Sequence, residues 1–150
     1  MIQRIQSVFI LLLIIGSALL FILPYKIYSA ISPEPMLIEI TMLPLFKPDA
    51  VSASVFVPAL LNLDILVMSF IALFSYKNRK KQMNFMLMLM VLGVSNFLLM
   101  YGLDFFPVED KAKVIRWPIF IPLLQILFAF LARIFIKKDD DLVRSADRLR

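Results

Sequence analysis

The chain is 150 residues long, which suits a single domain; 61% of it is hydrophobic, 18% is charged, and its net charge is +5. Soluble domains are about half apolar and about 25% charged, so this composition, with a mean hydropathy of +0.88, excludes an ordinary soluble fold and predicts a membrane protein. The chain has no cysteine and no histidine, which removes thiolate metal sites and the commonest general base, so we expect no enzyme, no metal and no cofactor.

Four apolar segments are long enough to cross a bilayer as helices, because a hydrocarbon core of about 30 Å needs about 20 residues at 1.5 Å of rise each. They cover approximately residues 7–23, 56–76, 83–103 and 117–136. The first segment could instead be a secretory signal with Arg4 as its positively charged n-region, but the residues after it offer a poor cleavage site. The sequence therefore predicts an all-α membrane protein, with a single integral domain over 1–150 built as an antiparallel four-helix transmembrane bundle.

Lysine and arginine residues gather on one side of the predicted spans. Most of the 16 basic residues lie near the N-terminus, in the hairpin "SYKNRKKQ" and after the fourth span. Positively charged flanks stay in the cytoplasm, so both termini are expected to be cytoplasmic. This topology explains the basic net charge, and nucleic acid is not an expected partner.

The longest expected loop outside the cytoplasm covers residues 24–50 and contains "MLIEITML", whose alternating pattern predicts a strand. A lone strand would expose its edge, so we expect it to pair with a second strand near "PLFKPDAVSAS" or with the loop 104–116. The sequence thus predicts a small extracytoplasmic β cap on the bundle. An irregular loop on the lipid headgroups is the alternative, and the cap could also dock another protein by strand addition.

The residues after the fourth span, 137–150, form a cytoplasmic tail that reads "KKDDDLVRSADRLR". Four apolar residues of this tail share one face at helical spacing, and the three aspartates suit the first turn of a new helix. Alternatively, the fourth span continues out of the membrane, or the tail is solvated and frayed. The functional interpretation is an amphipathic segment held against anionic lipid or a cytoplasmic partner.

Three motifs, "MIQRIQ" at the start, "KNRKKQ" in the hairpin and "LVRSADRLR" at the end, resemble those of a family of small four-helix bacterial inner-membrane proteins known only as a domain of unknown function. The resemblance implies a bacterial inner membrane, four spans and cytoplasmic termini, and it transfers no catalytic residue. It also suggests a set of partner-binding candidates on the cytoplasmic face. These are Gln3, Arg4, Gln6, Asn78, Arg79, Gln82, Arg144, Ser145, Asp147 and Arg148.

Every predicted span carries a polar side chain near mid-membrane, about 16–21 Å from its inner end by helical rise. This midplane polar layer consists of Ser17, Asn62, Asp64, Asn96 and Gln125. Asn62 and Asp64 are two residues apart, so they do not share a helix face. Three interpretations of Asp64 stay open: a neutral group that hydrogen-bonds Asn96 or Gln125, a proton or cation site, or an ion pair with a partner protein.

The sequence favours a non-catalytic membrane accessory or scaffold subunit that binds other membrane proteins. The alternative is a small proton- or ion-coupled transport unit that uses the midplane polar layer around Asp64. Membrane lipid and other membrane proteins are the expected partners, and no small-molecule substrate is indicated. A continuous wet path along the polar layer would favour transport, whereas a dry, closed layer would favour the subunit.

Overall fold

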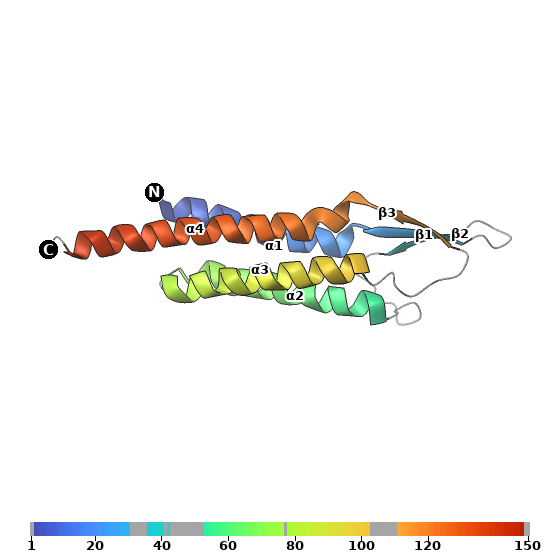
Figure 1. Cartoon of the computed structure of the whole chain (residues 1–150), viewed down its shortest axis with the longest axis horizontal. Helices are drawn as coiled ribbons and strands as arrows, with labels where there is room; N and C mark the ends of the chain where they lie inside the picture. The colour runs from blue at the N-terminus through green and yellow to red at the C-terminus, as the bar shows by residue number, and fades with distance from the viewer. Residues whose placement is uncertain are drawn as a thin grey trace.

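The computed structural model contains four long helices with a small sheet beyond one end of them (Figure 1). The structure describes residues 2–30, 36–40, 42, 53–76, 78–102 and 111–148. The helices are α1 (Ile2–Ile22), α2 (Ala53–Phe74), α3 (Arg79–Gly102) and α4 (Ile121–Arg148), and a 3-10 turn, η4 (Trp117–Phe120), leads into α4. Each apolar segment expected to cross the membrane overlaps one of these helices.

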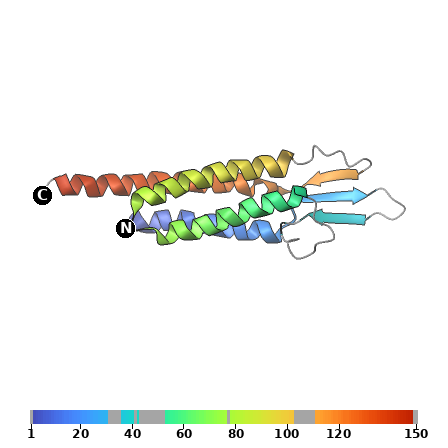
Figure 2. The same cartoon turned by 90° about the horizontal axis from the view of Figure 1, so that it is seen from below.

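The helices pack as an up-and-down bundle. Each helix contacts two neighbours along its length: α1 packs against α2, α2 against α3, α3 against α4, and α4 against α1. The first turn of α1 and the last turn of α4 lie at the same end of the molecule, and the sheet lies at the other (Figures 1 and 2). The prediction of an antiparallel four-helix bundle is therefore confirmed.

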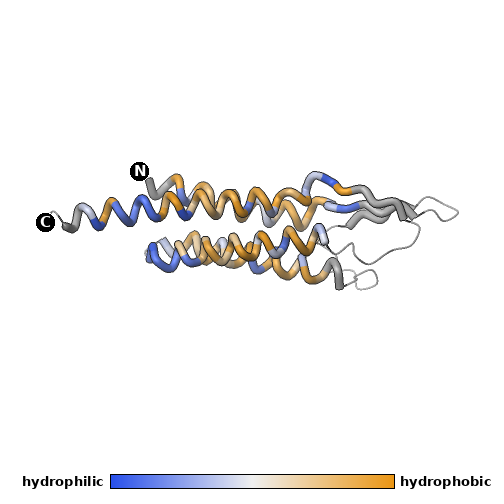
Figure 3. The backbone as a smooth tube through the Cα atoms, viewed as in Figure 1, coloured by the Kyte–Doolittle hydropathy of each residue, from blue (hydrophilic) through white to orange (hydrophobic). Residues whose placement is uncertain are grey.

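The four helices consist of hydrophobic residues over most of their length (Figure 3). All four helices are long and apolar enough to cross a membrane. They expose large hydrophobic side chains such as Val8, Val67, Val91 and Leu127. Exposure of this surface to water would be unfavourable by about 25 cal/mol per Å², whereas exposure to hydrocarbon is not. The chain is a multi-pass membrane protein.

Small residues let the helices approach closely inside the bundle. A Cβ atom built on Gly93 of α3 would lie 2.8 Å from Cγ1 of Ile126 on α4. A Cβ atom built on Gly16 of α1 would lie 3.5 Å from Cγ of Gln125, also on α4. Helices in membranes associate by such close packing, because hydrocarbon provides no hydrophobic driving force between them. α4 therefore fits against both neighbours through glycine contacts.

The three strands form one antiparallel sheet in the order β2–β1–β3. They are β1 (Lys26–Ala30), β2 (Met36–Ile40) and β3 (Lys111–Ile115), and Lys26 pairs with Ile40 on one side and Ile115 on the other. Loop 104–116 thus contributes a strand, but β3 pairs with β1 and not with β2, so the expected pairing of this loop with the 36–43 strand is wrong. The central strand is β1, whereas the candidate segment 44–54 falls partly outside the described residues and partly in α2.

The sheet does not cap the bundle. It continues the long axis of the molecule beyond the helix ends instead of lying across them (Figures 1 and 2). The physical reason is that β1 and β3 follow and precede their helices after very short connections. A hydrogen bond joins these two connections, because the Arg116 amide before η4 donates to the Tyr25 carbonyl after α1 at 3.1 Å. The strands therefore keep the direction of the helices.

The tail is part of α4, which runs without a break from Ile121 to Arg148. The expectation of a new helix that starts at the three aspartates is wrong, and the expectation that the fourth span continues is correct. Asp140 forms an ion pair with Arg144 at 2.9 Å, one turn further along the helix. Such a pair supports helix continuation. α4 consequently projects past the ends of the other three helices (Figures 1 and 2).

Candidate functional site

Four of the five residues of the midplane polar layer point into the bundle. Ser17, Asn62, Asn96 and Gln125 are all buried, with exposed fractions of 2% or less. The Asn62 side-chain amide donates to the Ser17 carbonyl at 2.9 Å, and the Gln125 amide donates to the Ser17 hydroxyl at 2.8 Å. These two hydrogen bonds connect α1 with α2 and with α4.

The buried layer retains unused hydrogen-bonding capacity. Among the described residues, Asn62 Oδ1, Gln125 Oε1 and both amide atoms of Asn96 have no hydrogen-bond partner. A buried polar atom without a partner costs about 1–3 kcal/mol. The layer therefore holds α1, α2 and α4 together through Ser17, while Asn96 on α3 adds polar groups that no other described residue satisfies.

Asp64 is not part of this layer, because its side chain is exposed on the outer surface of α2. The interpretation of Asp64 as interhelical glue to Asn96 or Gln125 is therefore wrong. The physical reason is helical geometry: two residues of an α-helix differ by about 200° around the axis at 3.6 residues per turn. With Asn62 bonded to α1, Asp64 points out of the bundle.

Asp64 lies in an apolar groove between α2 and α3 with a volume of about 450 Å³. Its other walls are Val67 and Met68 of α2 and Leu87, Met88, Val91 and Leu92 of α3. Asp64 has no hydrogen bond or ion pair with any other described residue. An acid at the centre of a membrane helix costs about 2.5–3.5 kcal/mol on insertion scales, so this carboxylate is an expensive feature of the α2–α3 groove.

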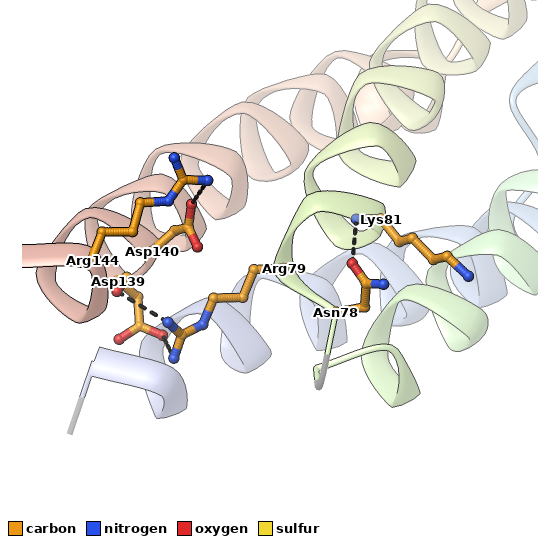
Figure 4. A network of polar contacts seen from close by, with 6 residues as sticks. All are labelled: Asn78, Arg79, Lys81, Asp139, Asp140 and Arg144. Atoms are coloured by element: carbon orange, nitrogen blue, oxygen red, sulfur yellow. Dashed lines mark hydrogen bonds and ion pairs between the residues drawn. The ribbon is translucent and has the colours of Figure 1, made fainter. Parts of the chain in front are cut away.

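A second polar cluster joins α3 to α4 at the end where the chain termini lie (Figure 4). Arg79, the first residue of α3, forms an ion pair with Asp139 of α4 at 2.9 Å, and its Nη1 donates to the Asp139 carbonyl at 3.3 Å. Asn78 caps α3, because its Oδ1 accepts a hydrogen bond from the Lys81 amide at 3.2 Å. Arg79 and Asn78 thus have structural roles in addition to any contact with a partner.

The other partner-binding candidates divide into buried, exposed and undescribed side chains. Gln6 and Gln82 are buried, so these two side chains do not lie on the surface, contrary to the expectation for partner-binding residues. The Gln82 amide donates to the Ala72 carbonyl of α2 at 3.1 Å. Arg144 and Ser145 are exposed. Arg144 forms its ion pair with Asp140, and the Ser145 hydroxyl donates to the Leu142 carbonyl at 2.8 Å. The remaining candidates lie in helices, but their side chains fall outside the described part of the chain. These are Gln3, Arg4, Asp147 and Arg148.

Two residues at the sheet end of α1 are more deeply buried than the sequence suggested. Tyr25 is 2% exposed and Lys26 is 4% exposed, and the Lys26 ammonium lies 5.8 Å from the centre of the Tyr25 ring. Burial raises the pKa of Tyr25 to about 12 and lowers the pKa of Lys26 to about 8. In the sequence, Lys26 looks like an ordinary flanking charge. A lysine directly after Pro24 and Tyr25, three residues past the end of the predicted span, was the available signal.

The described residues contain no group of three histidine, cysteine, aspartate or glutamate side chains that could hold a metal ion.

Comparison with curated proteins and with solved structures gives no match. A family model does match, over residues 2–149, and therefore covers nearly all of the bundle, the sheet and the projecting end of α4. The chain belongs to the family described as a domain of unknown function, DUF4293.

Proposed function

We propose that the protein is a non-catalytic accessory or scaffold subunit of the bacterial inner membrane, and that the projecting end of α4 binds the cytoplasmic part of another membrane protein. The proposed orientation, with both termini in the cytoplasm, is supported by the excess of lysine and arginine at that end. The observation that carries the proposal is the extension of α4 beyond the rest of the bundle (Figure 1).

The ion pair between Arg79 and Asp139 marks where α4 leaves its neighbour α3. The helix continues from Asp139 to Arg148, which is about 13 Å at 1.5 Å per residue. On this segment Leu142 and Val143 are exposed by 54% and 42%. Exposed apolar side chains on a rigid helix, flanked by charged residues, are a typical anchor for a protein partner.

Lipid alone explains this segment less well than a protein does. An amphipathic helix that binds a membrane surface lies in the plane of the interface. The end of α4 instead continues the axis of the bundle (Figures 1 and 2), which runs across the membrane. Its apolar residues therefore point sideways into the cytoplasm, where a folded partner can cover them.

The test compares partner recovery by the full chain with recovery by a variant that lacks residues 142–150. Each is purified in mild detergent from its native host, and co-eluting proteins are quantified. Deletion should remove at least one specific membrane protein from the eluate while leaving the thermal stability of the bundle unchanged, because the segment beyond Asp139 lies outside the bundle.

Point variants make this test sharper. Leu142→Ser combined with Val143→Ser should reduce recovery of the same protein as strongly as the deletion does. Lys137→Ser is the matched control, because Lys137 is exposed on α4 before the projecting segment. Equal recovery of that partner by the full chain and by the deletion variant would refute the proposal.

The alternative function is a small proton- or ion-coupled transport unit, and one observation favours it. The buried amide groups of Asn62, Asn96 and Gln125 have unused oxygen atoms in the bundle interior, and such groups can coordinate a cation or water. The burial of Ser17, Asn62, Asn96 and Gln125 argues against a wet path past these residues. Proton and sodium fluxes in reconstituted vesicles distinguish the two functions, because the subunit should conduct neither ion.

A further inference from the structure

The α2–α3 groove presents a single carboxylate, Asp64, on an otherwise apolar and membrane-facing surface. We propose that this groove binds a transmembrane helix of another membrane protein, and that this helix carries a lysine or arginine side chain at the depth of Asp64. The inference rests on the proposed role as a membrane subunit, and it adds the chemistry by which a partner would be recognised within the bilayer.

The depth of the groove follows from the helix register. Leu87 and Val91 line the groove together with Asp64, and they lie about 12 and 18 Å along α3 from Arg79 at 1.5 Å per residue. The hydrocarbon core is about 30 Å thick. Asp64 therefore lies close to the middle of the bilayer, too far from either headgroup region to be solvated by it.

A cation is the complement that this site lacks. Carboxylates inside membranes are normally paired with basic groups or face an aqueous cavity, but Asp64 has no ion pair or hydrogen bond with another described residue. The groove is apolar apart from Asp64, so an ion pair formed there would be weakly screened. A basic side chain on a partner helix is also unfavourable in the membrane interior without an opposite charge. Pairing it with Asp64 in the groove would give both charged groups a partner.

A lipid is a poor occupant for this groove. Acyl chains carry no cation, and the ammonium groups of lipid headgroups lie at the interface, about 15 Å from the bilayer centre. The two methionines of the groove, Met68 and Met88, have flexible side chains that adapt to the shape of a packed surface. A helix can bring both an apolar face and a central basic side chain to such a surface.

A second copy of this chain is also a poor occupant. Arg133 is the only lysine or arginine in the apolar helical segments 5–22, 56–74, 83–102 and 117–136. It lies about 9 Å along α4 from Asp139 at 1.5 Å per residue, which is nearer the cytoplasmic end than the level of Asp64. A symmetric pair of grooves would also bring two Asp64 carboxylates toward each other.

The experiment uses synthetic transmembrane peptides as probes. The full-length protein, labelled at Asn84→Cys, is reconstituted in phosphatidylcholine vesicles with fluorescent leucine–alanine helices of about 23 residues. One peptide has a central lysine, one has a central leucine, and one has its lysine about two turns nearer one end. Energy transfer, measured against the peptide-to-lipid ratio, gives the dissociation constant of each peptide.

We expect the central-lysine peptide to bind at least ten-fold more tightly than either of the others. Asp64→Asn should abolish this preference, and Asp64→Glu should retain part of it. Val91→Phe, which fills the groove, should weaken binding of the lysine peptide. Val8→Phe is the matched control, because Val8 is an exposed valine on α1, away from the groove.

Three results would overturn the proposal. Equal binding of the lysine and leucine peptides would mean that the groove recognises no cation. An undiminished preference in Asp64→Asn would mean that the cation binds elsewhere. Energy transfer between two labelled copies that Asp64→Asn removes would identify a second copy as the occupant. The variant that lacks residues 142–150 should keep peptide binding, so failure of the tail experiment and failure of this one can be told apart.

Discussion

The contact between Gly93 and Ile126 allows a quantitative test of how α3 and α4 are held together. Gly93→Ala places a methyl group 2.8 Å from Ile126 Cγ1, inside the range that carbon atoms occupy without displacement. The atom in the way belongs to the middle of a branched side chain, so Ile126 cannot simply swing its end aside. Either its rotamer changes or the two helices separate.

Two effects of Gly93→Ala oppose each other. Replacing a helical glycine by alanine stabilises a helix by about 0.5–1 kcal/mol. Adding a carbon atom to a packed interface costs about 1–3 kcal/mol. Because the clash is with a constrained atom, we expect the second effect to dominate and the free energy of unfolding to fall by about 1–2 kcal/mol.

The assay is unfolding of the purified protein in detergent, followed by circular dichroism, with two other glycines as controls. Gly16→Ala meets its nearest atoms at 3.5 Å, which is ordinary contact, and Gly102→Ala has no atom within 4 Å. Both controls should be neutral or slightly stabilising. The double variant Gly93→Ala/Ile126→Ala should lose less stability than the sum of the losses in the two single variants, because Ile126→Ala removes the atom that the new methyl group meets. A Gly93→Ala variant as stable as Gly102→Ala would refute the reasoning.

Two further predictions concern topology and pH. Single cysteines placed at Ser29 and Ser145 should react with a membrane-impermeant reagent from opposite sides of the membrane, and reaction of both from one side would disprove the proposed orientation. Lys26 has its pKa lowered to about 8 from 10.5, so the unfolded state binds more protons than the folded state between these values, and stability should rise with pH in that window. From pH 8 to 9.5 the free energy of unfolding of the wild type should rise by about 1–2 kcal/mol relative to that of Lys26→Met. If the difference in unfolding free energy between the two proteins stays the same over this range, the burial of Lys26 is contradicted.

The four helices could be predicted because their signal is a bulk property of the sequence. A run of about 20 apolar residues can cross a bilayer in only a few ways, since every backbone polar group must be satisfied within the segment. The continuation of α4 through Asp139 was one of several open alternatives. Local ion pairs such as Asp140–Arg144 support it, and this pairing becomes apparent in the sequence only once the segment is assumed to be helical.

The direction in which each polar residue points could not be predicted. The sequence shows that Asn62 and Asp64 lie on different faces of α2, but it does not show which of them faces the bundle. That choice depends on how α2 rotates against α1, where the Ser17 carbonyl accepts the Asn62 amide. The central strand β1 was missed for a similar reason. Its sequence, KIYSA, lacks the apolar–polar alternation seen in β2, and one of its two partners, β3, comes from a distant part of the chain.

The unbroken course of α4 has a mechanical consequence. The helix is about 42 Å long at 1.5 Å per residue, and its first turn follows directly from η4 and β3. Strand β3 is hydrogen-bonded to β1, which in turn continues from the end of α1. A stiff rod thus joins the sheet on one side of the bundle to the free helical end on the other. The sheet and the projecting end of α4 are therefore linked by a single continuous helix, so we expect a partner bound at one of these ends to affect the position of the other.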